Sequence, residues 1–340
     1  MEQQIKFCTT RDGVRIAYSA VGDGEPFVKV ANWLNHLEMD WISPVWSHWL
    51  AEFGRGQKLI RYDERATGLS DRNVDDLSLD AFVDDLKSVV DALGLKCFPM
   101  LAISQGGPVA IAYAARYPEK VSHLVIYGSF ATGWKKGKLS ESDREKREAQ
   151  LALIKQGWDS KNPAIRQLFT TTCLPGGSSA EHTSFNELQR ESVSAGNAAR
   201  IFEAIGELDV ADVLPELKVP TIVLHSKFDA MVPFEEGRKL ASMIPDARFI
   251  PLESSNHILL RSEPAWERFR NEVNSFLGRA NSLDSNSSTV LERRCPKCHR
   301  SFSEEMFFCL DDGEKLVDFV GADADQKNGE LTKIFGLEKR

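Results

Sequence analysis

The sequence lacks the features that would place it in a special class of protein. The 340 residues contain no run of about 18 apolar side chains, so we expect no membrane span. The N-terminus, MEQQIKFCTTRDG, lacks the charged and then apolar pattern of a secretory signal. Basic residues number 42 against 50 acidic ones, and this net charge of −8 argues against a nucleic-acid partner.

Cysteine is also scarce. Of the six copies, Cys8, Cys97 and Cys173 lie far apart along the chain. Scattered cysteines of this kind are typical of free thiols in a reducing compartment. We therefore expect a cytoplasmic protein.

Most of the chain alternates between short apolar runs and amphipathic patterns. The runs predict strands at 57–64, 97–104, 121–130, 219–229 and 247–254, and the amphipathic patterns predict helices at 79–95, 107–118, 234–245 and 263–280. Near the N-terminus, residues 14–22 and 26–32 predict a hairpin around the turn residues GDGEP. This alternation predicts an α/β fold, with a mostly parallel sheet and helices on both of its faces.

Two segments interrupt the alternation. Residues 131–214 predict several helices between two strands, so we expect them to form a cap over the sheet. Residues 281–292, NSLDSNSSTVLE, have the composition of a linker. The predicted organisation is a main domain at 1–280, this linker, a small unit at 293–317 and a tail at 318–340. Side chains of the cap predicted to face a pocket are Phe185, Phe202 and Ile205.

Ser104 lies where a predicted strand ends and a predicted helix begins, in the stretch AISQG. The pattern small-x-Ser-x-Gly differs by one residue from the G-x-S-x-G turn that exposes a nucleophilic serine. Ala102 and Gly106 occupy the two small positions. A serine at such a junction is also a common helix N-cap, so the motif alone leaves both roles open.

A nucleophilic serine needs a base, and the base needs an acid that orients it. Asp229 follows the predicted strand of TIVLHSKFD, and His257 follows the last predicted strand. Both positions are at the carboxyl ends of strands, where sites form in open α/β sheets. The loop after the strand at 121–130 offers no rival acid. The pattern therefore predicts a triad of Ser104, His257 and Asp229.

Residues 1–279 resemble the α/β-hydrolase family, because GDGEPFVKVANW, RYDERATGLSDR, AISQGGPVA, LHSKFDAMVP and NHILL occur in that family's order and spacing. They look most like bacterial hydrolase modules that accompany signalling domains. The resemblance implies the α/β-hydrolase fold, with Ser104 as nucleophile, His257 as general base and acid, and Asp229 as orienter. By position it also implies an oxyanion hole made by the backbone N–H groups of Trp33 and Gln105, although Ala-Asn replaces the frequent His-Gly before Trp33.

The remaining cysteines are clustered in CPKCHRSFSEEMFFCLDDG. Their spacing resembles a short zinc ribbon, with predicted ligands Cys295, Cys298, Cys309 and Asp312, or His299 in place of the aspartate. A unit of about 25 residues needs a metal or another staple to fold. The alternative is a disordered tail whose cysteines have no role as metal ligands. Residues 281–340 carry 9 basic and 12 acidic side chains, and this net charge of −3 favours a protein partner or homo-oligomer.

The sequence thus predicts a serine hydrolase that cleaves a small-molecule ester-like substrate through an acyl-enzyme, most simply a carboxylesterase or lactonase. No cofactor is expected for catalysis. The alternative is a ligand-sensing module that keeps the fold and signals through the ribbon. Because a pure sensor has no need of all three triad residues, the complete triad favours the enzyme.

Overall fold

The computed structural model describes residues 3–137, 140–279, 291–299, 301–302 and 317–320. The chain divides into two compact units, Met1–Arg279 and Ala280–Arg340. The strands of the first unit are β1 (Ile5–Thr9), β2 (Arg15–Val21), β3 (Glu25–Lys29), β4 (Gln57–Tyr62), β5 (Phe98–Ile103), β6 (Val121–Tyr127), β7 (Thr221–Ser226) and β8 (Arg248–Leu252). Its α-helices are α1 (Leu37–Ile42), α2 (Ser47–Gly54), α3 (Leu79–Ala92), α4 (Gly106–Arg116), α5 (Glu141–Gly157), α6 (Ala164–Cys173), α7 (Ser179–Ser192), α8 (Ala195–Glu207), α9 (Phe234–Met243) and α10 (Pro264–Phe276).

The strands form one eight-stranded sheet in the order β1-β2-β4-β3-β5-β6-β7-β8. The neighbours from β4 to β8 pair in parallel, and β2 runs antiparallel to both β1 and β4. The predicted mostly parallel sheet is confirmed, but the predicted hairpin between residues 14–22 and 26–32 is wrong. Strand β4 lies between β2 and β3, so the N-terminal hairpin is formed by β1 and β2 instead.

Helices cover both faces of the sheet because the side chains of a strand alternate between its faces. On β5, Met100 and Ala102 belong to one buried cluster, and Leu101 and Ile103 belong to the other. The first cluster receives side chains from α3, α4 and α9, among them Phe82, Ile111 and Leu240. The second receives side chains from α2 and α10, among them Trp49, Phe53, Trp266 and Phe269.

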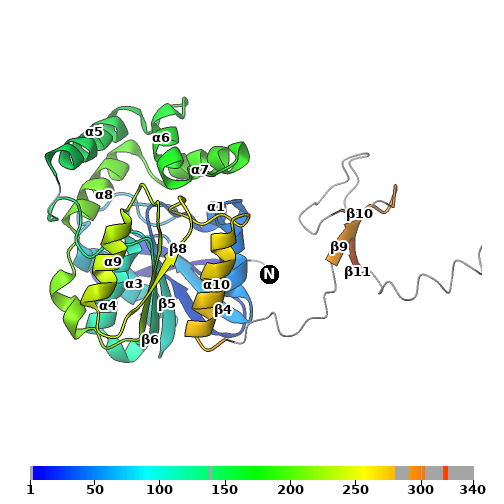
Figure 1. Ribbon diagram of the computed structural model, residues 1–340, viewed down its shortest axis with the longest axis horizontal. Helices are drawn as coiled ribbons and strands as arrows, with labels where there is room; N and C mark the ends of the chain where they lie inside the picture. The colour runs from blue at the N-terminus through cyan, green and yellow to red at the C-terminus, as the bar shows by residue number, and fades with distance from the viewer. Residues whose placement is uncertain (1–2, 138–139, 280–290, 300, 303–316, 321–340) are drawn as a thin grey trace, which may run out of the picture. The chain divides into compact units, whose positions relative to one another are not determined.

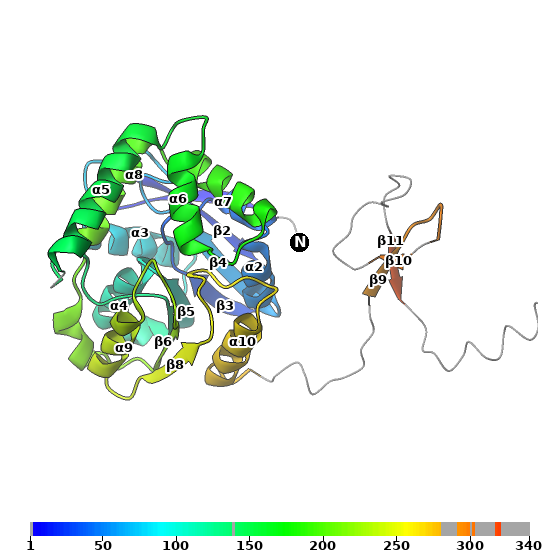
Figure 2. The same ribbon diagram turned by 45° about the horizontal axis from the view of Figure 1, so that its top comes forward.

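Four helices, α5 to α8, lie between β6 and β7 in the sequence. Figures 1 and 2 show them grouped together over one end of the sheet. Serine starts three of them: Ser140, Ser178 and Ser194 each accept a hydrogen bond from a backbone N–H of the first turn. Such caps satisfy donors that a helix start otherwise leaves without a partner. Across the described ranges, no helix combines the length and the apolar character needed to cross a membrane.

The second unit contains a small antiparallel sheet of β9 (Leu291–Arg294), β10 (Ser301–Phe302) and β11 (Val317–Val320), in the order β10-β9-β11. The buried Cys295 directly follows β9, at the start of a turn. Its Sγ accepts hydrogen bonds of 3.4 Å from the backbone N–H groups of Lys297 and Cys298. The predicted ligands Cys309 and Asp312 lie outside the described residues.

Candidate active site

Ser104 lies in the turn between β5 and α4, with a left-handed backbone φ of +53°. Few residues other than glycine adopt this conformation, so neighbouring groups must hold it. The Ser104 N–H donates to the carbonyl of Tyr127 at 2.9 Å, and the Ser104 carbonyl accepts from Ser129 Oγ at 2.7 Å. A half-buried serine on a left-handed turn at the end of a strand is the geometry of a nucleophile turn.

Glycine is required directly after this turn, because α4 passes close to neighbouring segments. A Cβ at Gly106 would lie 2.6 Å from the carbonyl oxygen of Ala31. One at Gly107 would lie 1.9 Å from Ser129 Oγ. The small position that the sequence pattern assigns to Gly106 therefore has a steric cause.

His257 and Asp229 lie together, as their positions after β8 and β7 predict. His257 Nδ1 and Asp229 Oδ2 are 2.6 Å apart, and both side chains are buried. The backbone of His257 is fixed by a 2.7 Å bond from its N–H to the carbonyl of Cys173. A carboxylate at this nitrogen favours the tautomer in which Nδ1 carries the hydrogen and Nε2 can accept a proton.

Asp229 is held by its other oxygen. Oδ1 accepts hydrogen bonds from the backbone N–H groups of Met231 at 2.8 Å and Val232 at 3.0 Å. Burial alone would raise the pKa of Asp229, but the charge and hydrogen bond of His257 outweigh it, so the pKa lies below its usual value. The carboxyl is therefore ionised when it orients His257.

A second histidine, His225, lies near the same carboxylate oxygen, with its Nε2 3.7 Å from Asp229 Oδ2. Its Nε2 bonds the carbonyl of Val232 at 2.9 Å. Burial lowers the pKa of His225, so the ring is neutral and does not compete for Asp229 as a charged partner. This geometry agrees with a structural role for His225.

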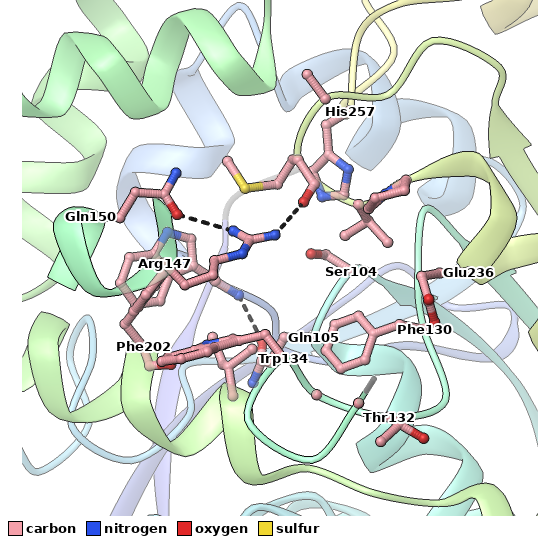
Figure 3. Close-up of a pocket in the computed structure, with 18 of the residues that line it drawn as sticks. Ser104, Gln105, Phe130, Thr132, Trp134, Arg147, Gln150, Phe202, Glu236 and His257 are labelled. Carbon is pink, nitrogen blue, oxygen red and sulfur yellow. Dashed lines mark hydrogen bonds between the residues drawn. The ribbon is translucent and has the colours of Figure 1, made fainter. Parts of the chain in front are cut away.

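Ser104 and His257 open into a shared cavity of about 800 Å³. Figure 3 shows the serine hydroxyl on the same side of the cavity as the imidazole ring. Helices α5 and α8 contribute Arg147, Phe202 and Ile205 to the lining of this cavity. The expected pocket residue Phe185 is not among the side chains that line the cavity and belongs to the core cluster around α2 and α10.

The two predicted oxyanion donors both lie at this cavity, but one of them is engaged. The N–H of Trp33 donates to the side-chain oxygen of Gln105 at 2.8 Å. The Gln105 backbone N–H lies at the start of α4, where a helix leaves its first amides without intrahelical partners. The role of the Trp33 amide as an oxyanion donor therefore stays a prediction. It requires that the Gln105 side chain move away from the Trp33 N–H when the oxyanion forms.

Glu64 is a buried acid beside the site, in the loop that follows β4. Its Oε2 accepts a 2.7 Å hydrogen bond from Gln105 Nε2, which orients the carboxamide toward Trp33. Burial raises the pKa of Glu64 to about 8, against a smaller lowering by the Gln105 hydrogen bond. Glu64 thus keeps its proton in the folded protein at neutral pH.

This raised pKa predicts a pH-dependent stability. Between about pH 4 and pH 8 the folded chain holds a proton on Glu64 that the unfolded chain has lost, so stability falls as pH rises through this window. Glu64→Gln removes the carboxyl that loses this stability as pH rises. The glutamine oxygen can still accept the hydrogen bond from Gln105. We expect the variant to gain on the order of 3 kcal/mol relative to the natural protein between about pH 5 and pH 8.5 in urea unfolding.

The matched control is Glu119→Gln, which removes an exposed carboxylate. Its stability relative to the natural protein should not change across the same pH range. If the stability of Glu64→Gln relative to the natural protein is as independent of pH as that of Glu119→Gln, Glu64 does not hold a proton in the folded protein.

Comparison with known proteins identifies the family of the chain. Residues 38–264 match the model of the alpha/beta hydrolase fold family, so the chain belongs to that family. The chain is 27% identical over 285 residues to the non-heme chloroperoxidase CPO-A1 of Kitasatospora aureofaciens, an alignment that covers 80% of this chain and 99% of the relative. It is 25% identical over 259 residues to the bifunctional esterase/perhydrolase DCH of Acinetobacter calcoaceticus, with coverage of 74% and 92%.

A solved esterase from Exiguobacterium antarcticum superposes with a TM-score of 0.70 at 22% identity, over 80% of this chain and 99% of that one. At this identity the match establishes the shared fold. The predicted family and main fold are confirmed by these matches.

Proposed function

We propose that the protein is a serine hydrolase that cleaves an ester-like bond of a small molecule. One observation carries the proposal: a buried His257–Asp229 pair at 2.6 Å opens into the same cavity as a serine held on a left-handed turn. The relative named as a bifunctional esterase/perhydrolase supports ester hydrolysis as the reaction of this chain. Free thiols at Cys8, Cys97 and Cys173 support the proposed cytoplasmic location.

In the proposed reaction, the Ser104 oxygen attacks the ester carbonyl while His257 Nε2 takes the serine proton. Asp229 holds the Nδ1–H tautomer and stabilises the imidazolium that forms. The Gln105 backbone amide stabilises the oxyanion, joined by Trp33 once the Gln105 side chain moves. His257 then gives its proton to the leaving alcohol, and water, activated by His257, releases the acyl group.

The first test is a panel of p-nitrophenyl esters and lactones of graded acyl length. We expect the enzyme to turn over at least one class of ester, with longer acyl chains preferred over short ones because Trp33, Phe130, Trp134 and Phe202 line the cavity. The rival proposal of a ligand-sensing module predicts binding of these compounds without turnover. Saturable binding together with no hydrolysis of any panel member would favour the sensor.

For the second unit we propose a structural zinc ion held by Cys295, Cys298 and Cys309, with Asp312 or His299 as the fourth ligand. In support, Cys295 Sγ already accepts the N–H groups of Lys297 and Cys298, which is the way a thiolate ligand is oriented in a zinc knuckle. Within the described ranges, no group of three potential ligands is assembled, and Cys309 and Asp312 lie outside them. A protein partner or homo-oligomer through this unit stays a prediction.

Elemental analysis tests the zinc proposal. We expect about one zinc per chain, lost in Cys295→Ser and Cys298→Ser because each removes a thiolate ligand. Cys97→Ser, at an exposed cysteine of the first unit, is the control and should keep its zinc. Ester hydrolysis should be unchanged in all three variants, since no predicted ligand belongs to the catalytic site. Protein purified without chelator that contains no zinc would contradict the proposal.

A further inference from the structure

The cavity contains a cationic side chain that the proposed catalytic steps do not use. Arg147 projects from α5 and lines the cavity together with Ser104 and His257. Figure 3 shows its guanidinium between Gln150 on one side and Ser104 and His257 on the other. The side chain is half-buried.

Among the described residues, the hydrogen bonds of Arg147 reach only neutral acceptors. One terminal nitrogen donates to the Gln150 side-chain oxygen at 3.2 Å, and the other donates to the carbonyl of Met231 at 3.0 Å. In the part of the chain that the structure describes, no ion pair joins Arg147 to a carboxylate. A guanidinium has five N–H donors, so three remain for a ligand.

An unpaired cation in a half-buried site is costly unless something compensates for its lost hydration. Burial lowers the pKa of Arg147 more than the nearby Asp143 raises it, as this loss of hydration requires. The two neutral acceptors fix the direction of the guanidinium, and they leave its charge uncompensated. A carboxylate that enters the cavity supplies the missing charge and fits the planar fork of donors.

The balance of charge around the cavity favours a ligand with a single negative charge. The basic side chains that line it are Lys136, Lys146, Arg147 and Lys239, and the acidic ones are Asp143, Asp209 and Glu236, a sum of +1 from 4 − 3. Lys146 pairs with Asp143 at 3.1 Å. The whole chain carries −8, so the cavity attracts an anion against the overall charge of the protein.

We propose that Arg147 is the carboxylate-binding group of the substrate site, and that the substrate is an ester or lactone with a free carboxylate on an apolar stem. This inference rests on the proposed hydrolase function. The apolar wall of Trp33, Trp134 and Phe202 holds the stem, Arg147 holds the carboxylate, and Ser104 meets the ester carbonyl. Arg147 thereby sets which ester reaches the nucleophile in a reactive position.

The test compares two esters of the same length, anionic mono-p-nitrophenyl glutarate and neutral p-nitrophenyl pentanoate. Arg147→Gln should lower kcat/KM for the glutarate ester by about tenfold or more and change that for the pentanoate ester by less than about threefold. The control is Arg144→Gln, which removes the same charge from an exposed position of α5 outside the cavity lining. It should leave the ratio of the two kcat/KM values unchanged.

Arg147 also donates a hydrogen bond to the loop that follows Asp229. A purely structural role therefore predicts that Arg147→Gln lowers kcat/KM for both esters by the same factor. An equal loss for both, or an unchanged ratio, overturns the proposal. A conservative variant, Arg147→Lys, keeps the charge and should keep part of the preference for the anionic ester. Complete loss of that preference in Arg147→Lys together with loss of neutral turnover would also indicate a structural role and overturn the proposal.

A binding measurement separates failure of this inference from failure of the proposed hydrolysis. Monomethyl glutarate is titrated into Ser104→Ala and into Ser104→Ala/Arg147→Gln, with tryptophan fluorescence as readout because Trp33 and Trp134 line the cavity. Tighter binding to the variant that keeps Arg147 supports the carboxylate site even if no ester is hydrolysed. Equal binding to both proteins overturns it even if Ser104 is the nucleophile.

Discussion

Ser104→Ala is expected to lower kcat for an activated ester by about five orders of magnitude. Without the hydroxyl no acyl-enzyme forms, and the cavity retains only its oxyanion donors and its binding of the ester. The change should be mild for the fold, because Ser104 is held through its backbone by Tyr127 and Ser129. Alanine can occupy the left-handed turn at about the same cost as serine.

Initial rates with p-nitrophenyl esters measure this loss, and thermal unfolding verifies that the variant is folded. Ser242→Ala, an exposed serine on α9, is the matched control and should keep full activity. A purified, folded Ser104→Ala protein that hydrolyses esters at the natural rate would remove the proposed mechanism.

The second large effect is expected at Asp229, where asparagine should lower kcat by about three to four orders of magnitude. Two backbone N–H groups, of Met231 and Val232, donate to Oδ1 and will keep the asparagine oxygen at that position. The asparagine NH₂ group then faces His257 Nδ1 and donates to it. The imidazole hydrogen moves to Nε2, so this nitrogen can no longer take the proton of Ser104.

The kcat of Asp229→Asn is measured with the same esters and compared with Asp246→Asn, an exposed change of the same chemistry. Because the carboxamide keeps the loop bonds, the unfolding temperature should change little while kcat falls. Equal kcat for the two variants would show that Asp229 does not orient the base.

The sequence predicted those parts of the molecule that depend on local patterns. Apolar runs located the strands from β4 to β8, and the residues that follow β5, β7 and β8 gave Ser104, Asp229 and His257. The reason is physical: parallel strands bring their carboxyl ends to one edge, so chain order suffices to group these side chains. The pairing of β2 depends on a strand 36 residues later, counted from Val21 to Gln57, and local turn residues could not reveal it.

The side-chain contacts within the site could not be predicted in the same way. The bond from Trp33 to the Gln105 side chain, and from Gln105 to Glu64, joins three separate loops. Arg147 looks in the sequence like one of many charged residues on a polar helix, since ESDREKREAQ contains seven of them. Only the approach of α5 to the loop after Asp229 distinguishes it. Such contacts depend on tertiary packing, on which local periodicity carries no information.

The most direct test of the central claim is covalent labelling with a fluorophosphonate, followed by peptide mass spectrometry. An activated serine displaces fluoride and keeps the phosphonyl group, whereas an N-capping serine does not react. We predict one adduct per chain, on the peptide that contains Ser104, with labelling lost in Ser104→Ala and strongly slowed in Asp229→Asn. An unlabelled Ser104 in protein that hydrolyses esters, or an adduct on another residue, would contradict Ser104 as the nucleophile.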